Sequence, residues 1–217
     1  MKHLSFISGV LIFLSGIIQG QDHKIFQSEI DALEKRFSGM INSPNLIIFT
    51  GSSSIRFWED LQSSFPEKNI INTGFGGSTM SDLLFYLDYV VIKYKPVEVF
   101  VYEGDNDLAF GEKAGKIRIE ADSLIMRIHR SLPQTEIIIL SVKPSPLRWA
   151  LRDSYIELNT MYKSLPEIYS YVTFLDLWSP LIGPAGRPRK EVYMPDSLHL
   201  NSKGYSIWNE IVKKVLK

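Results

Sequence analysis

LIIFTGSSS, residues 46–54, is a run of β-branched and aromatic side chains that ends in a turn of glycine and serine. A run of this composition, bounded by turn residues, is typical of a β-strand. It contains no charged residue, so it predicts a buried strand rather than an exposed one.

Four further runs of the same kind follow along the chain, at residues 69–72, 97–102, 136–141 and 172–176. Apolar residues recur at helical spacing between and after these runs, over residues 79–94, 114–132, 154–165 and 202–215. A leading helix is expected over residues 27–37, outside the sheet. Strands that alternate with helices predict a single-domain α/β fold, a flavodoxin-like three-layer sandwich. Its five-stranded, mostly parallel sheet should carry helices on both faces.

Composition and charge fit an ordinary soluble domain and indicate no particular chemistry. The chain has 217 residues, about one domain, and this is long enough to bury a continuous core. Lys plus Arg equals Asp plus Glu at 24 each, so no net charge attracts nucleic acid or anionic lipid. The chain has no cysteine, which excludes thiol nucleophiles, disulfide frameworks and cysteine-based zinc sites.

The first twenty residues are set apart from the rest. Lys2 and His3 precede an almost unbroken apolar run over residues 4–18, which small and polar residues then end. This run is shorter than the ~20 residues that a membrane-spanning helix needs. The layout is typical of a secretory signal peptide, with an uncleaved N-terminal anchor as the alternative. We expect residues 1–20 to be removed and residues 21–217 to form the mature domain. The protein would then be secreted or periplasmic, without stable membrane insertion.

Four short blocks stand out: GSSS at 51–54, NTGFGG at 72–77, GDND at 104–107 and DSLH at 196–199. The first three follow predicted strands, and in parallel sheets the ligand site lies at the carboxyl ends of the strands. A fold needs turns at both ends of its strands, but not Asn, Asp and repeated Gly at one end only. In their order, and across nearly the whole mature chain, the blocks resemble those of the SGNH or GDSL-type serine hydrolases. The resemblance implies ester hydrolysis without a cofactor.

Ser53 is the expected nucleophile. It matches the serine of the family's Gly-Asp-Ser block, at a point where the strand turns into a helix. A serine hydroxyl needs an adjacent base to become a useful nucleophile. Because Ser52 replaces the usual Asp, Ser52 and Ser54 remain alternatives. Serine is also a preferred helix cap, and Ser54 could serve only in that way.

His199 is the expected base, oriented by Asp196. Of the other three histidines, His3 lies in the predicted signal peptide and His23 in the leading segment, and His129 lies in a helical run beside two arginines. Asp196 precedes His199 by three residues, close enough in a turn to accept a hydrogen bond from one ring nitrogen. That bond would fix the tautomer and leave the other nitrogen to face the serine. The alternative is that Asp196 only caps the last helix.

Three groups are candidates for stabilising the oxyanion: the backbone N–H groups of Ser53 and Gly77, and the side-chain amide of Asn106. The resemblance places Gly77 by its distance from Asn72 in the second block. Glycine would let the backbone approach the substrate closely. Asn106 could alternatively be only a turn residue.

The third block departs from the family's frequent Gly-Gly-Asn-Asp, because Asp105 stands before Asn106. Its carboxylate could discourage anionic substrates, or it could point away and bond to the loop. The acidic run at 103–107 lacks the ligand spacing of a calcium loop, so no metal site is predicted.

A proline-rich loop at residues 143–149 ends in Arg148 and Trp149, at the carboxyl edge of the sheet. Both are candidates for binding substrate, although Trp149 could equally cover the core. A second basic cluster around Arg187 is expected to be a solvated loop.

The resemblance implies an acyl-enzyme mechanism in which Ser53 attacks the ester and His199 takes its proton. The family's site is typically open, and no long insertion in this chain would form a lid. We therefore expect short acyl groups, such as acetyl on carbohydrate, on a small-molecule or glycan substrate. The alternatives are a lysophospholipase-like or thioesterase-like acylhydrolase, and a non-catalytic carbohydrate-binding protein on the same scaffold.

Overall fold

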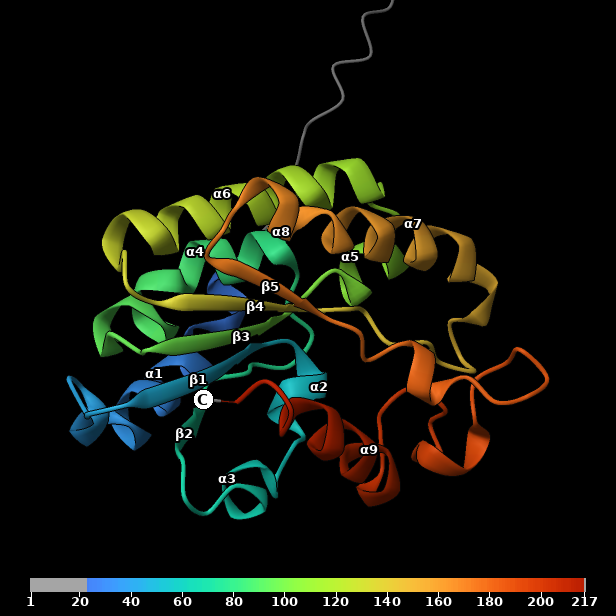
Figure 1. Cartoon of the computed structure of the whole chain (residues 1–217), viewed down its shortest axis with the longest axis horizontal. Helices are drawn as coiled ribbons and strands as arrows, with labels where there is room; N and C mark the ends of the chain where they lie inside the picture. The colour runs from blue at the N-terminus through green and yellow to red at the C-terminus, as the bar shows by residue number, and fades with distance from the viewer. Residues whose placement is uncertain (1–22, 217) are drawn as a thin grey trace, which may run out of the picture.

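Five parallel strands form one sheet in the order β2-β1-β3-β4-β5 in the computed structural model, which describes residues 23–216 (Figure 1). The predicted signal peptide lies outside these residues. The strand bounds are β1 Leu46–Gly51, β2 Asn69–Asn72, β3 Glu98–Tyr102, β4 Glu136–Leu140 and β5 Val172–Leu175. All four strand pairings are parallel, so the predicted α/β fold class is confirmed.

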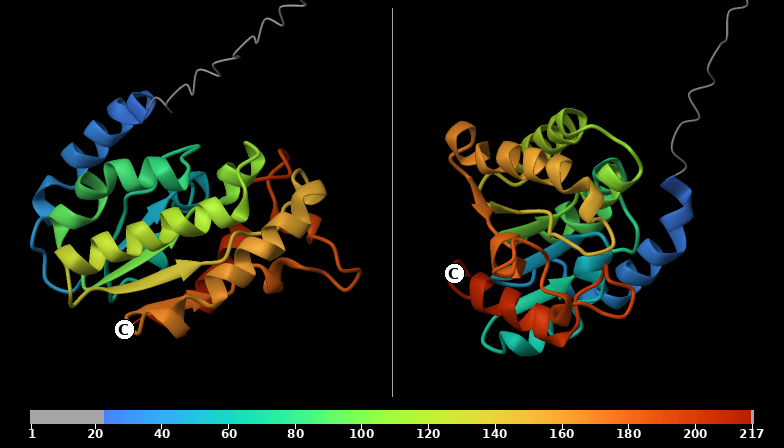
Figure 2. Two further views of the ribbon diagram at one scale, coloured as in Figure 1. Left: turned by 90° about the horizontal axis from the view of Figure 1, so that it is seen from above. Right: turned by 90° about the vertical axis from the view of Figure 1, so that its right-hand side faces the viewer.

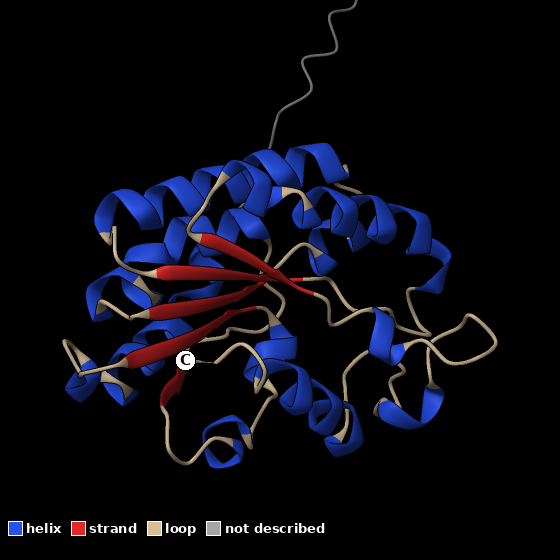
Figure 3. Ribbon diagram, viewed as in Figure 1, coloured by secondary structure: helices blue, strands red, loops and turns tan. Residues whose placement is uncertain are grey.

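Helices cover both faces of this sheet, and the strands lie between them (Figures 2 and 3). The longer helices are α1 Gln27–Arg36, α4 Met80–Val90, α6 Ala114–Ser131, α7 Arg152–Lys163 and α9 Ser202–Val212. The short ones are α2 Ser53–Arg56, α3 Leu61–Ser64, α5 Asp105–Ala109 and α8 Leu165–Ile168. The single-turn 3₁₀ helices are His23–Phe26, Ser38–Met40, Ile92–Tyr94, Trp149–Leu151, Ser179–Leu181 and Lys190–Val192. None of the described helices is both long and apolar enough to span a membrane.

Alternation along each strand divides the core into two layers. In β1, Ile48 faces the layer that α1, α4, α6 and α7 cover, whereas Ile47 and Phe49 face the layer that α2, α3 and α9 cover. In β3, Val99 and Phe100 divide in the same way. Strands that are buried on both faces explain the apolar runs in the sequence. Because these strands are parallel, the carboxyl ends of β1, β2 and β3 lie at one edge of the sheet, where the polar blocks follow them.

Candidate active site

A sharp turn at the end of β1 gives the three serines of the first block different exposure to solvent. Gly51 has φ of +128°, and a Cβ at this position would lie 2.0 Å from the backbone oxygen of Tyr102, so only glycine fits. The next N–H, of Ser52, donates to that same oxygen at 3.1 Å. Ser52 and Ser54 are each only 1% exposed, whereas Ser53, the first residue of α2, is partly exposed.

The chain brings Ser53 together with the two residues of the last block. His199 Nε2 lies 3.0 Å from Ser53 Oγ, and His199 Nδ1 lies 2.6 Å from Asp196 Oδ2. Ser53 and His199 are 146 positions apart in the sequence. This chain of contacts from serine to histidine to carboxylate can activate the serine hydroxyl, because the imidazole can take the hydroxyl proton.

Asp196 is held by its own turn. Its Oδ1 accepts from the backbone N–H groups of Leu198 at 2.9 Å and His199 at 3.0 Å. Burial opposes ionisation, but the hydrogen bonds from His199 and these N–H groups outweigh it and lower the pKa of Asp196 to about 2. The carboxylate is therefore ionised at any ordinary pH. The Phe57 ring packs edge-on against the imidazole, with ring centroids 4.8 Å apart.

In the glycine-rich block, Gly77 differs from Gly74 and Gly76 in its hydrogen bonds and its exposure. The N–H of Gly74 donates to Asn72 Oδ1 at 3.0 Å, and the N–H of Gly76 donates to Glu29. Gly77 is exposed at φ of +84°, and no described atom outside Gly77 and its two chain neighbours lies within 4 Å of the position that a Cβ would take. The block is tied to the nucleophile turn because the N–H of Phe75 donates to the oxygen of Gly51 at 2.9 Å.

Asn106 lies in α5, buried, with its side-chain amide joined to the second block. Its Nδ2 donates to the backbone oxygen of Ser78 at 2.9 Å, directly after Gly77. Ser78 Oγ in turn donates to Glu103 Oε1 at 2.6 Å. The second and third blocks are thus one bonded unit at the carboxyl edge of the sheet.

The Asp105 carboxylate bonds to Lys143 and Arg148 of the loop after β4, as in the second of its two expected arrangements. Its side chain is 5% exposed and accepts from Lys143 Nζ at 3.0 Å and from Tyr102 OH at 2.9 Å, and also from Tyr155 OH. Burial opposes ionisation, but the charges of Lys143 and Arg148 hold the pKa of Asp105 well below its usual range. Neither Lys143 nor either of the two tyrosines has a role that is predicted from the sequence. A lysine two residues after the apolar run at 136–141 is the available signal.

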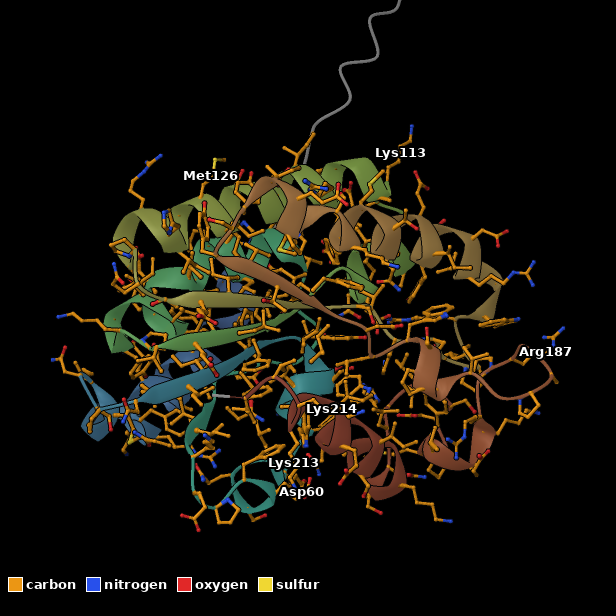
Figure 4. All side chains as sticks on the ribbon, in the orientation of Figure 1. Asp60, Lys113, Met126, Arg187, Lys213 and Lys214 are labelled. Atoms are coloured by element: carbon orange, nitrogen blue, oxygen red, sulfur yellow. The ribbon has the colours of Figure 1, made fainter. Side chains whose placement is uncertain are left out.

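Arg148 and Trp149, predicted to bind substrate, differ in their surroundings. The Arg148 guanidinium donates to Asp105 and to Asn106, so two of its nitrogens are engaged within the protein. Trp149 is half-buried and stacks on Trp178, with ring centroids 6.0 Å apart. Arg187 is exposed on the irregular loop that follows β5, as expected (Figure 4).

Asp107, the last residue of the third block, is buried and supports α4. Its Oδ1 accepts from the backbone N–H of Met80 at 3.0 Å, and its Oδ2 has no hydrogen-bond partner among the described residues. Burial raises the pKa of Asp107 to about 7, and the charges of Glu120 and Asp82 act in the same direction. The folded protein therefore keeps this proton up to about pH 7, whereas the unfolded chain loses it near pH 4.

Replacing Asp107 by Asn should flatten the dependence of stability on pH. Because the pKa of Asp107 is higher in the folded state, its proton stabilises the folded protein. This contribution is complete below the pKa that Asp107 has in the unfolded chain, and it is lost as the pH rises toward about 7. A shift from 3.8 to about 7 corresponds to at most about 4 kcal/mol. Urea unfolding at pH 5 and pH 7.5 should show a smaller drop in the free energy of unfolding for Asp107→Asn than for the wild type. Equal drops would mean that another group carries the dependence.

Residues 47–207 match the family model of the GDSL-like lipase/acylhydrolase family. No curated protein matches the chain significantly. A Streptococcus pneumonia protein, provisionally named a platelet activating factor, is 25% identical with a TM-score of 0.77, over 89% of this chain and 95% of that one. A GDSL-like lipase from Bacteroides thetaiotaomicron is 18% identical with a TM-score of 0.70, over 90% and 97%.

A variant of an acetyl xylan esterase from Geobacillus stearothermophilus also has this fold, at 18% identity and a TM-score of 0.66, over 82% of this chain and 96% of that one. The family model spans most of the chain, from β1 into α9, and includes all four blocks. The chain belongs to the GDSL-like lipase/acylhydrolase family.

Proposed function

We propose that this chain is a secreted serine esterase that hydrolyses short acyl esters, such as acetyl groups on carbohydrate, through an acyl-enzyme. One observation carries the proposal: the continuous contact from Ser53 through His199 to an ionised Asp196, at 3.0 and 2.6 Å. The proposal of secretion rests on the sequence of residues 1–20 alone.

In the first half of the reaction, Ser53 Oγ attacks the ester carbonyl carbon while His199 Nε2 takes the hydroxyl proton. The carbonyl oxygen becomes an oxyanion, which the N–H groups of Ser53 and Gly77 and the amide of Asn106 stabilise. The carbon–oxygen bond to the alcohol then breaks, and the imidazolium gives its proton to the leaving alkoxide. Asp196 stabilises the imidazolium and keeps its ring in place.

In the second half, water attacks the Ser53 ester and passes a proton to His199. The second tetrahedral intermediate collapses, the carboxylic acid leaves, and the proton returns to Ser53 Oγ. His199 accepts and returns every proton that is transferred, so the reaction requires no cofactor.

One comparison supports short acyl groups. A structural relative is named an acetyl xylan esterase, which supports acetyl on a glycan.

Initial rates on p-nitrophenyl acetate, butyrate and octanoate should therefore fall with chain length. We expect kcat/KM for acetate to exceed that for octanoate by about tenfold or more. Acetylated xylan oligosaccharides, followed by acetate release, test the glycan part. Faster turnover of octanoate would contradict the preference for short acyl groups and indicate a long-chain acylhydrolase instead. No activity on any ester would contradict the enzyme itself and favour a binding protein.

A further inference from the structure

A buried group of charged side chains, Asp105, Lys143 and Arg148, lies next to Asn106. Asp105 accepts from Lys143 Nζ at 3.0 Å and from Arg148 Nη1 at 2.5 Å. The exposed fractions of the three side chains are 5%, 1% and 16% respectively. Burying charge is costly unless it is compensated, and here two cations face one carboxylate. The contacts of the second cation, Arg148, show what it adds.

Arg148 fixes the orientation of the Asn106 amide. Its Nη2 donates to Asn106 Oδ1 at 3.0 Å, while Asn106 Nδ2 donates to the Ser78 oxygen at 2.9 Å. An arginine can only donate and a backbone oxygen can only accept, so the amide cannot be turned around without losing both bonds. One Nδ2 hydrogen goes to Ser78. The second hydrogen is the one that Asn106 can offer to a substrate oxygen.

The same contact strengthens that donor. A hydrogen bond from a cation to the amide oxygen draws charge away from the amide nitrogen and makes its remaining N–H a better donor. The group of Asp105, Lys143 and Arg148 also carries one net positive charge. Charges fixed before the reaction stabilise an oxyanion without having to reorganise during it.

Arg148 is itself held in place from the other side. Its Nη1 also reaches the backbone oxygen of Asp105, at 3.2 Å, and Tyr155 OH donates to that oxygen at 3.1 Å. Its backbone N–H donates to Ser145 Oγ at 3.2 Å. Because its guanidinium is fixed by bonds to Asp105, Arg148 is a rigid hydrogen-bond partner for Asn106, the residue after Asp105.

We infer that Arg148 is a positioning residue for the oxyanion site, which it serves by orienting and polarising the amide of Asn106. This inference rests on the function proposed above and replaces the predicted contact between Arg148 and substrate. Asp105, which also accepts from Lys143, anchors Arg148 from within the protein.

The test compares Arg148→Met with Arg148→Lys on p-nitrophenyl acetate. Arg148→Met should lower kcat by about 10²-fold and leave KM within about threefold, because the lost interaction acts on the transition state. Arg148→Lys should lie between Met and the wild type, since lysine keeps a charge but cannot bridge both acceptors. Arg130→Met, at the exposed end of α6, is the matched control and should match the wild type.

A double-mutant cycle decides whether Arg148 acts through Asn106. In an Asn106→Ala background, Arg148→Met should cost less than about threefold, because the group it orients is gone. An equal cost in both backgrounds would overturn the inference, and so would a raised KM with unchanged kcat, which would indicate direct contact with substrate. If Arg148→Met melts below the assay temperature, the cycle is run with Arg148→Lys.

Hydrogen exchange of the Asn106 side-chain amide tests the inference without any substrate. Its NMR signals are assigned by their loss in Asn106→Ala. They should exchange about tenfold faster or more in Arg148→Met than in the wild type or Arg130→Met. An unchanged rate would overturn the inference. If the wild type hydrolyses no ester and exchange is still faster in Arg148→Met, the orienting role of Arg148 is supported and only the proposed function is contradicted.

Discussion

Ser53→Ala is expected to lower kcat for p-nitrophenyl acetate by about 10⁴ to 10⁶-fold and to leave the protein folded. The hydroxyl that His199 contacts at 3.0 Å is the only proposed nucleophile, so its removal ends acyl-enzyme formation. The remaining rate would come from the oxyanion site and from substrate binding alone. An alanine side chain fits the space of a serine, so thermal unfolding should change little.

Ser54→Ala is the matched control, since it deletes the same atom one residue further along α2. Ser54 is 1% exposed, and the structure brings Ser53 instead to the imidazole, so its activity should stay within about threefold of the wild type. Mass spectrometry after reaction with a fluorophosphonate should place the adduct on Ser53. Full activity in Ser53→Ala together with a large loss in Ser54→Ala would assign the nucleophile to Ser54.

The strands and long helices could be predicted because their patterns extend over many residues. The five apolar runs correspond to β1 to β5, and the helical spacing over residues 114–132 corresponds to α6. Among the short helices, the sequence indicates only α2, which begins at Ser53 where the strand turns into a helix. The others, α3, α5 and α8, have four, five and four residues, too few for apolar periodicity to appear. The third block was therefore expected to be a turn, although it begins α5.

The four blocks indicate which residues form the site, but the sequence does not show which hydrogen bonds and ion pairs connect them. Asp105 meets Lys143 across 38 positions and Arg148 across 43. In a sequence, a lysine and an arginine near prolines are typical of a solvated loop. Burial and pairing depend on the packing of β3, β4 and α7, which only the structure shows. The contact between Arg148 and Asn106 has no sequence signature of its own.

Asp196→Asn is expected to lower kcat by about 10⁴-fold, although the substitution changes no side-chain shape. The turn determines which way the new amide faces. Asp196 Oδ1 accepts from the N–H groups of Leu198 and His199, so the asparagine oxygen must take that position. The asparagine nitrogen then faces His199 Nδ1 as a donor. The imidazole must carry its proton on Nε2 instead, where it cannot accept the Ser53 proton.

Asp176→Asn separates this effect from the loss of charge. Asp176 Oδ1 accepts from the backbone N–H groups of Trp178 at 2.9 Å and Ser179 at 3.0 Å, the same turn as at Asp196. Its Oδ2 accepts from the Ser179 hydroxyl, so no histidine is involved. This variant should retain activity within about threefold. If Asp196→Asn kept more than about a tenth of the wild-type kcat, the carboxylate would not control the tautomer of His199. The imidazole would then be held by its other contacts, among them the Phe57 ring, which packs perpendicular to it.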